Sequence, residues 1–169
     1  MGTKWGSYMD SVDIINSNNL IILLDLNYTL VGNSAEIKYI RPYQKKIKTE
    51  KYRDWLIELI AKYYVIIITA RPDYQKEETI KSFEEKLKGW MPDEMYFQEE
   101  NDRPPVAKKK LLKKYIFPKH GIQSNYFAIE SNPRTKNMYK KYNIPSVSVY
   151  DDEAIELRKI LDKGFLSEG

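Results

Sequence analysis

Short apolar runs alternate with longer amphipathic stretches along most of the chain, and this pattern predicts an α/β fold. Apolar residues fill the runs almost without interruption, as is typical of strands that are buried on both faces of a parallel sheet. The expected strands cover 20–24, 64–69, 95–97, 126–130 and 145–150. Apolar residues at helical spacing between these runs indicate helices over 50–63, 73–88, 106–117 and 152–161.

The order of these elements predicts a three-layer α/β/α Rossmann-like fold with a five-stranded parallel sheet and right-handed crossovers. At 169 residues the chain is most simply one domain. We expect this domain to span 20–169. The preceding segment, 1–19, has no clear hydrophobic period, and we expect a loosely ordered lead-in there.

Composition narrows the chemistry that is open to the chain. There is no cysteine, which excludes disulfides, thiol nucleophiles and thiolate zinc sites. The one histidine, His120, lies in a Pro-Lys-His-Gly turn, where we expect an ordinary loop residue. Catalysis would therefore depend on carboxylates, lysines, hydroxyls and a metal. No apolar run approaches the roughly 20 residues of a membrane span, so we expect a cytoplasmic protein without membrane contact.

The net charge of +4 favours a phosphate-bearing partner, although only weakly at this size. Lysines and tyrosines also alternate in several stretches, which is one pattern of nucleic-acid binding. Most of these lysines are explained equally well as the polar faces of helices. General nucleic-acid binding is therefore the weakest of the functions that we consider.

A carboxylate follows the first expected strand directly, at the end of the sheet where open α/β folds bind ligands. The segment Asp25-Leu26-Asn27-Tyr28-Thr29-Leu30 resembles the first motif of the haloacid dehalogenase (HAD) superfamily, Asp-x-Asp-Gly-Thr-Leu. The resemblance implies that Asp25 is a nucleophile that forms an aspartyl-phosphate. The second Asp of the motif, a general acid and base, is Asn27 here, and an amide cannot transfer that proton.

Later segments resemble the other HAD motifs in the same order. Thr69-Ala70-Arg71-Pro72 ends the second expected strand, where the family places a hydroxyl that holds a phosphate oxygen. Asp102-Arg103 precedes Lys108, and this spacing resembles the phosphatase domain of polynucleotide kinase-phosphatases. Lys108 is therefore the expected match to the third-motif lysine, with Lys109 as the alternative. Glu130-Ser131 follows the fourth strand, where the family places two acids that hold Mg²⁺.

The HAD resemblance assigns roles to these residues as a set. It implies catalytic roles for Asp25, Asn27 and Lys108, substrate binding by Thr69, Ala70, Arg71 and Arg103, and Mg²⁺ binding by Asp25, the backbone carbonyl of Asn27, Glu130 and Ser131. Simpler interpretations stay open for several of them. Thr69 could merely end a strand, Arg71 could be a surface charge, and Lys108 could belong to a solvated helix face.

The HAD resemblance also implies a strand order of 5-4-1-2-3, which would bring Asp25, Thr69 and Glu130 together. The family inserts a cap after the first motif, but 31–48 is too short for a folded cap domain, so the expected cap is minimal. We expect a Mg²⁺-dependent phosphohydrolase that acts on a phosphate monoester, such as a nucleotide or polynucleotide 3'-phosphate, with reduced activity. The alternative is a catalytically inactive HAD-fold module that binds a nucleotide, a nucleic acid or a protein partner.

Overall fold

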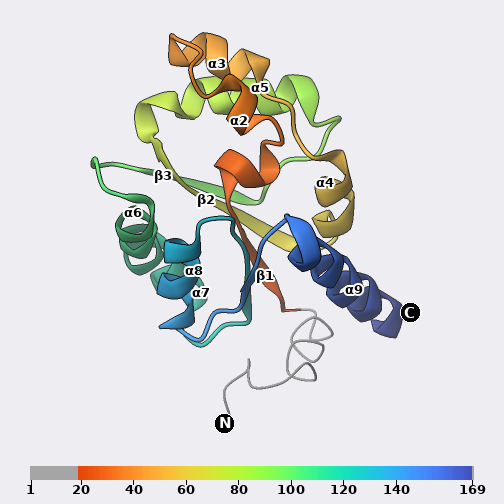
Figure 1. Ribbon diagram of the computed structural model, residues 1–169. Coiled ribbons are helices and arrows are strands. Elements are labelled where there is room, and N and C mark those ends of the chain that lie inside the picture. The colour runs from red at the N-terminus through yellow and green to blue at the C-terminus, as the bar shows by residue number, and fades with distance from the viewer. Residues whose placement is uncertain (1–18, 169) are drawn as a thin grey trace.

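A parallel β-sheet forms the centre of the chain in the computed structural model, which describes residues 19–168 (Figure 1). Within these residues five strands lie in the order β3-β2-β1-β4-β5, which confirms both the predicted sheet and its strand order. The predicted lead-in over 1–19 lies outside the described residues, apart from Asn19. The strands are β1 (Ile21–Leu24), β2 (Tyr64–Pro72), β3 (Glu94–Gln98), β4 (Tyr126–Ile129) and β5 (Ser146–Val147).

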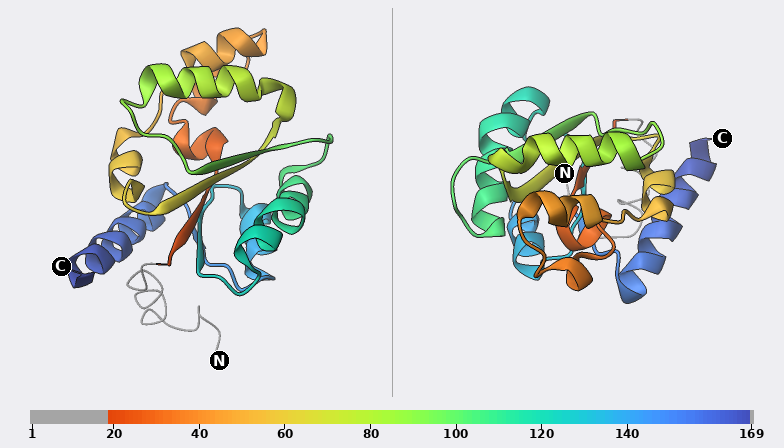
Figure 2. Two further views of the ribbon diagram at one scale, coloured as in Figure 1. Left: turned by 180° about the vertical axis from the view of Figure 1, so that it is seen from behind. Right: turned by 90° about the horizontal axis from the view of Figure 1, so that it is seen from above.

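Helices cover both faces of the sheet, as the alternating pattern predicts (Figure 2). These helices are α4 (Asp54–Ile60), α5 (Lys76–Lys86), α6 (Pro104–Leu111), α7 (Phe117–His120), α8 (Pro133–Lys140) and α9 (Asp151–Glu168). Ile22 and Leu24 point into a core with α4, α5 and α9, whereas Ile21 and Leu23 point into a core with α6, α8 and the turn between α6 and α7. Successive residues of a strand face opposite sides, so β1 contributes to both cores.

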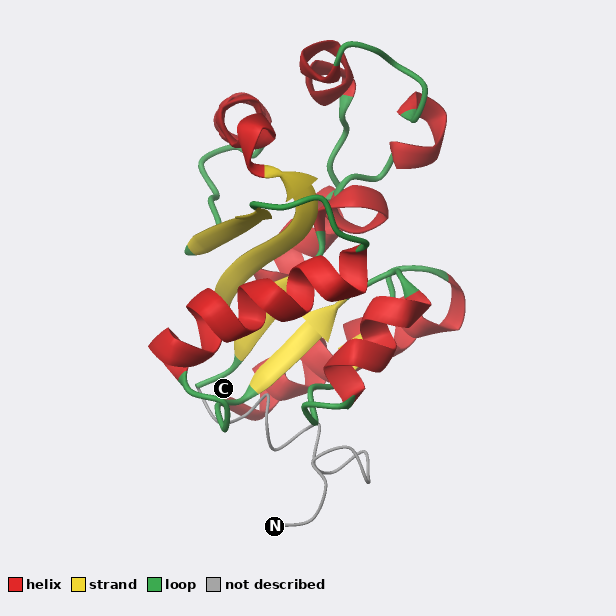
Figure 3. Cartoon of the chain, turned by 90° about the vertical axis from the view of Figure 1, so that its left-hand side faces the viewer, coloured by secondary structure: helices red, strands yellow, loops and turns green. Residues whose placement is uncertain are grey.

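The segment that follows β1 forms the expected minimal cap. It contains a turn at Leu26–Leu30 and two short helices, α2 (Ser34–Ile37) and α3 (Tyr43–Thr49). Figure 3 shows these short helices joined by loops beyond the ends of the strands. The cap thus lies on the same side of the sheet as the carboxyl end of β1.

All of the predicted strands and helices differ from the structure at one end or both, and two of these differences have a clear local reason. The strand expected over 145–150 ends at Val147, because the next backbone N–H groups turn to side chains: that of Ser148 donates to Glu153 and that of Tyr150 to Ser148. The helix expected over 106–117 runs from Pro104 to His120, with a wider π-type turn at Leu112–Ile116.

The prediction that His120 lies in a loop was wrong. The wider turn lets the chain continue past Pro118, which occupies the first turn of α7, where its missing N–H costs nothing. His120 lies in the last turn of α7, and its Nε2 contacts Glu94 Oε2 at 2.6 Å. None of the helices within 19–168 has the length and apolar character needed to cross a membrane.

Candidate active site

One buried ammonium group joins two carboxylates at the carboxyl end of the sheet. Lys108 Nζ donates to Asp25 Oδ1 at 2.7 Å and to Glu130 Oε1 at 2.6 Å. Lys108 and Glu130 are only 2% and 1% exposed, and Asp25 is 8% exposed. Three segments that are far apart in the sequence therefore meet at a single buried ion-pair cluster.

The sheet register places the two carboxylates side by side. Leu24 of β1 pairs with Ile129 of β4, and the residues that follow them are Asp25 and Glu130. The Asp25 N–H donates to the Ile129 carbonyl at 3.0 Å, so the alignment continues past the strand ends. Lys108 comes from α6, whose Ala107 and Leu111 are buried and hold the helix against the sheet.

Hydrogen bonds from neighbouring groups fix both carboxylates. Thr29 Oγ1 donates to Asp25 Oδ2 at 2.6 Å and also lies 2.6 Å from Ser131 Oγ. Glu130 Oε2 accepts from the backbone N–H groups of Ser131 and Asn132, at 3.1 and 3.0 Å. Glu130 thus accepts three hydrogen bonds in all, which leaves one direction of its carboxylate for a further partner.

Burial and mutual charge shift the pKa values of the cluster. Burial by itself would lower the pKa of Lys108, but Asp25 and Glu130 outweigh it and hold the pKa above its ordinary value. Burial raises the pKa of Glu130, and Asp25 adds to this effect while Lys108 opposes it. Lys108 is therefore a permanent cation, and its single positive charge is shared between two carboxylates.

A cavity of about 580 Å³ opens over this cluster. Thr69 and Ala70 of β2 line it beside Asp25, so the second-motif residues reach the same place as the first. Thr69 Oγ1 accepts from the Arg71 N–H at 3.0 Å, which leaves the hydroxyl proton available to a ligand. The remaining residues around the cavity are Asn27, Tyr28, Pro104, Lys108, Glu130, Ser131, Asn132, Pro133 and Tyr150.

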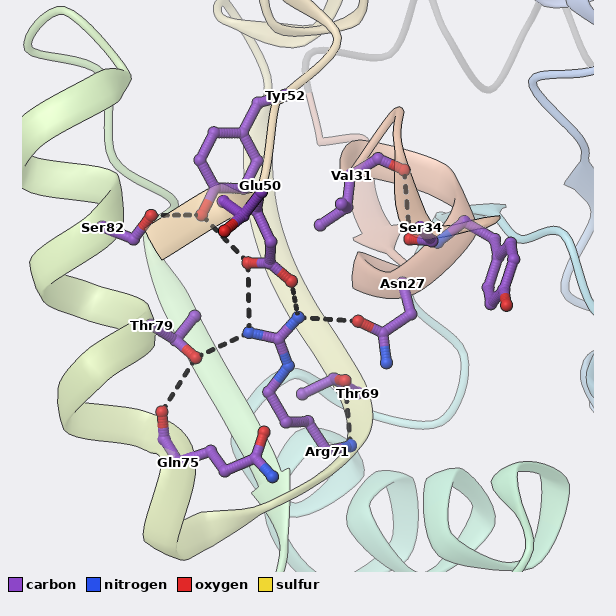
Figure 4. A network of polar contacts seen from close by, with 12 residues as sticks. Asn27, Val31, Ser34, Glu50, Tyr52, Thr69, Arg71, Gln75, Thr79 and Ser82 are labelled. Atoms are coloured by element: carbon purple, nitrogen blue, oxygen red, sulfur yellow. Dashed lines mark hydrogen bonds and ion pairs between the residues drawn. The ribbon is translucent and has the colours of Figure 1, made fainter. Parts of the chain in front are cut away.

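Arg71 does not line this cavity; its side chain forms a second ion pair with Glu50 (Figure 4) and lines a separate cavity of about 300 Å³. Its Nη2 donates to Glu50 Oε2 at 2.5 Å and to Asn27 Oδ1 at 2.6 Å, and its Nη1 donates to Thr79 at 2.8 Å. Arg71 is 5% exposed, which corrects the simpler interpretation of this residue as a surface charge. It contacts the predicted site through Asn27, whose side chain it orients.

The other basic residues of the prediction differ in their positions. Lys109, the alternative to Lys108, is exposed on α6, and Arg103 is exposed just before this helix. Neither of them lines the cavity. The sequence patterns did not single out Glu50, the partner of Arg71, or Tyr150, which lines the cavity. The only sequence signal for Glu50 is that it is a single acid among lysines, and no residue pattern around Tyr150 indicates a role at the site.

The donors at the cavity fit a Mg²⁺ ion in kind but are few in number. Asp25 and Glu130 are the two carboxylates that line it, and Glu130 retains one free direction. Within 19–168 no group of three or more His, Cys, Asp or Glu residues could hold a metal. Mg²⁺ commonly takes one or two carboxylates and completes its shell with water and substrate oxygens, and this donor set meets that minimum.

Neither a family model nor a curated protein matches this sequence. Solved structures do match the fold. The chain is similar to a chain of a Pnkp1/Rnl/Hen1 complex, with 20% identity and a TM-score of 0.61, and to one of a Pnkp1/Rnl/Hen1 RNA repair complex, with 20% identity and a TM-score of 0.59. Each match covers 79% of this chain, which spans only 46% and 43% of those two chains.

A third similar structure is that of hypothetical protein XCC2798 from Xanthomonas campestris. It has 14% identity and a TM-score of 0.52, and the match covers 100% of this chain and 93% of that one. At these identities the likeness concerns the fold alone. The chain therefore shares its fold with parts of an RNA repair assembly.

Proposed function

We propose that this chain is a Mg²⁺-dependent phosphohydrolase of the HAD type that acts on phosphate monoesters, with a nucleotide or polynucleotide 3'-phosphate as the expected substrate. The observation that carries the proposal is the meeting of Asp25, Lys108 and Glu130 beneath one cavity. The fold shared with chains of RNA repair complexes supports a nucleic-acid substrate.

In the proposed reaction, an Asp25 oxygen attacks the phosphorus atom. A new P–O bond forms to Asp25 while the ester P–O bond breaks, and the leaving oxygen keeps the electron pair. Lys108 has one N–H beyond the two that it donates to carboxylates, and it would donate this to a phosphate oxygen together with the Thr69 hydroxyl. Water then attacks the phosphorus and releases Asp25 and inorganic phosphate.

Proton transfer is the weak step of this site. The leaving oxygen must take its proton from water, because Asn27 has no acidic proton and its Oδ1 is held by Arg71. Loss of general acid and base assistance typically costs a factor of roughly 10² to 10⁴ in rate. We therefore expect slow turnover, with aryl phosphates less affected because a phenolate leaves without a proton.

A bound Mg²⁺ would neutralise charge on the phosphate and polarise its oxygens. Asp25, the Asn27 backbone carbonyl and Glu130 are the residues that would hold it, and the Ser131 hydroxyl would contact it through water. Ser131 in place of a second acid weakens this donor set, because a hydroxyl carries no charge.

Phosphate release from an aryl phosphate such as 4-nitrophenyl phosphate tests the proposal. We expect release that requires Mg²⁺ and that disappears in Asp25→Ala, while Asp152→Asn, an exposed acid away from the cavity, serves as the matched control. The double variant Asn27→Asp with Ser131→Asp restores the missing acids and should raise the rate by a factor of about 10² or more. The absence of any release from both proteins would contradict the proposal.

The alternative is a binding module without turnover. It is favoured by one observation, namely that Asn27 and Ser131 are both engaged in hydrogen bonds within the protein. In that case the double variant would remain inactive, while the wild-type protein would still bind a nucleotide or a nucleic-acid end.

A further inference from the structure

One residue at the cavity has a backbone conformation that side chains rarely adopt. Tyr28 has φ of 63° and ψ of 0°, in the left-handed region, where a Cβ atom is crowded. Lys88 and Asn143 also have positive φ, but they follow the ends of α5 and α8, where this conformation is common. Tyr28 instead lies in the turn directly after β1, at the position where the HAD motif has glycine.

Hydrogen bonds hold the Tyr28 peptide in this conformation from both ends. Its N–H donates to Ser34 Oγ at 2.8 Å. Its carbonyl accepts from the Tyr150 hydroxyl at 2.6 Å and from Ser131 Oγ at 3.2 Å. Unfavourable backbone conformations that the surroundings fix in this way are concentrated at functional sites.

The contacts of the Tyr28 ring give no sign that it stabilises the fold. Tyr28 is 43% exposed, and its side chain makes no hydrogen bond or ring contact within the described residues. It lines the cavity over Asp25 and Lys108, and so does Tyr150, which is 40% exposed. The Arg53 guanidinium lies 4.9 Å from the centre of the Tyr150 ring and also donates to its hydroxyl, so Tyr150 is held in place.

We propose that Tyr28 is a specificity-determining residue whose ring, beside that of Tyr150, stacks on a planar aromatic group attached to the bound phosphate. This inference rests on the proposed function, because it assumes that the phosphate binds over Asp25. A sugar phosphate without a base would reach the same polar groups but would leave both rings exposed to water. The site would then prefer phosphate esters with a nucleobase over those without one.

Binding of two phosphates that differ only in the base tests this inference apart from turnover. Calorimetry would compare adenosine 3'-monophosphate with ribose 3-phosphate, both with Mg²⁺. Stacking of one base on an aromatic side chain corresponds to a preference of about 5- to 150-fold. We expect this preference in the wild-type protein, and we expect Tyr28→Asn to reduce it by about fivefold or more while the affinity for ribose 3-phosphate changes little.

The substitutions separate the ring from the backbone. Asparagine tolerates the left-handed conformation, so Tyr28→Asn should keep the turn, and its melting temperature should equal or exceed that of the wild-type protein. Tyr28→Phe keeps the ring and should retain the preference for the base. An undiminished preference in Tyr28→Asn would overturn this inference alone.

Two other outcomes distinguish this inference from the proposed function. Failure of both phosphates to bind the wild-type protein would overturn both proposals. If the protein preferred the base through the Tyr28 ring but released no phosphate, this inference would stand and only the proposed hydrolysis would be overturned.

Discussion

Two buried cations, Arg71 and Lys108, lie at the carboxyl end of the sheet, and they differ in the number of carboxylates that face them. Arg71 faces one carboxylate, Glu50, and its remaining N–H groups reach Thr79 and Asn27. Lys108 faces two carboxylates, Asp25 and Glu130, and each cluster borders a cavity, of about 300 Å³ at Arg71 and about 580 Å³ at Lys108. The first cluster has one carboxylate for its cation, whereas the second has two, and burial together with Asp25 raises the pKa of Glu130 to about 7.

This difference indicates which cluster supports the fold and which is available for chemistry. The terminal Nη1 and Nη2 groups of Arg71 donate to Glu50, Thr79 and Asn27, so a ligand that binds these groups would have to displace one of those acceptors. Lys108 retains an unused N–H, and Asp25 and Glu130 retain unused lone pairs that face the cavity. A buried charge that loses its single partner is costly, whereas a cluster with a surplus of one sign can lose one member cheaply.

Glu50→Gln should have the largest effect on stability. The amide would place an N–H against the Arg71 guanidinium and leave a buried cation without a counter-charge, at a cost of about 3–5 kcal/mol. Urea unfolding would measure this loss, with the exposed Glu58→Gln as the matched control, expected to stay within about 0.5 kcal/mol. If Glu50→Gln lowered the free energy of unfolding by less than about 1 kcal/mol, the Arg71 cluster would not be the one that stabilises the fold.

Glu94→Gln should have an intermediate effect that depends on pH. Burial would raise the pKa of Glu94, but hydrogen bonds from Tyr64, Tyr96, His120 and Lys119 outweigh it and lower the pKa to about 2. The unfolded chain binds this proton near pH 4.5, so the ionised group stabilises the fold above pH 4.5, and this contribution is lost as the pH falls toward 2.

Unfolding in urea between pH 7 and pH 2 would check this expectation. Glu94→Gln should lose about 2 kcal/mol at pH 7, as for hydrogen bonds to a charged group. Its stability should then fall less steeply than that of the wild-type protein below pH 4.5. If the stability of the two proteins changed with pH in the same way, the four hydrogen bonds to Glu94 would not make the stability depend on its ionisation.

Asp25→Asn should have the smallest effect on stability and a complete effect on phosphate release. The Asn Oδ1 can still accept from Lys108, its amide can donate to Thr29 Oγ1, and Thr29 can in turn donate to Ser131. Lys108 keeps Glu130 as its counter-charge. We expect a change below about 1 kcal/mol in urea unfolding, and a loss as large as that of Glu50→Gln would contradict the comparison.

The sequence was sufficient to predict the fold, because its strands are continuous apolar runs and the helices between them have a clear period. Strand order followed from the HAD resemblance, and parallel register then fixed where Asp25 and Glu130 would meet. Strand ends were harder to predict, as β5 illustrates. Whether a backbone N–H at a strand end bonds to a neighbouring strand or to a side chain depends on local contacts, which leave no hydrophobic pattern in the sequence.

The pairing of Arg71 with Glu50 was not predictable in the same way. These residues lie 21 positions apart, Glu50 just after α3 and Arg71 in β2, and ion pairs across such distances have no sequence pattern. The position of Tyr28 was clear from the motif, but its exposure and its left-handed conformation depend on Ser34, Ser131 and Tyr150. Roles that depend on contacts between distant segments therefore required the structure.

The surplus of negative charge around Lys108 has a consequence for how a ligand enters. A phosphate monoester at neutral pH brings up to two more negative charges into a cavity whose charged lining residues are Asp25, Lys108 and Glu130. Above pH 7, where Glu130 is ionised, the cavity should thus repel a phosphate at short range, and added salt or a divalent cation should promote encounter by screening this repulsion. Entry to the cavity would then be governed by the ions that accompany the phosphate as much as by the residues that receive it.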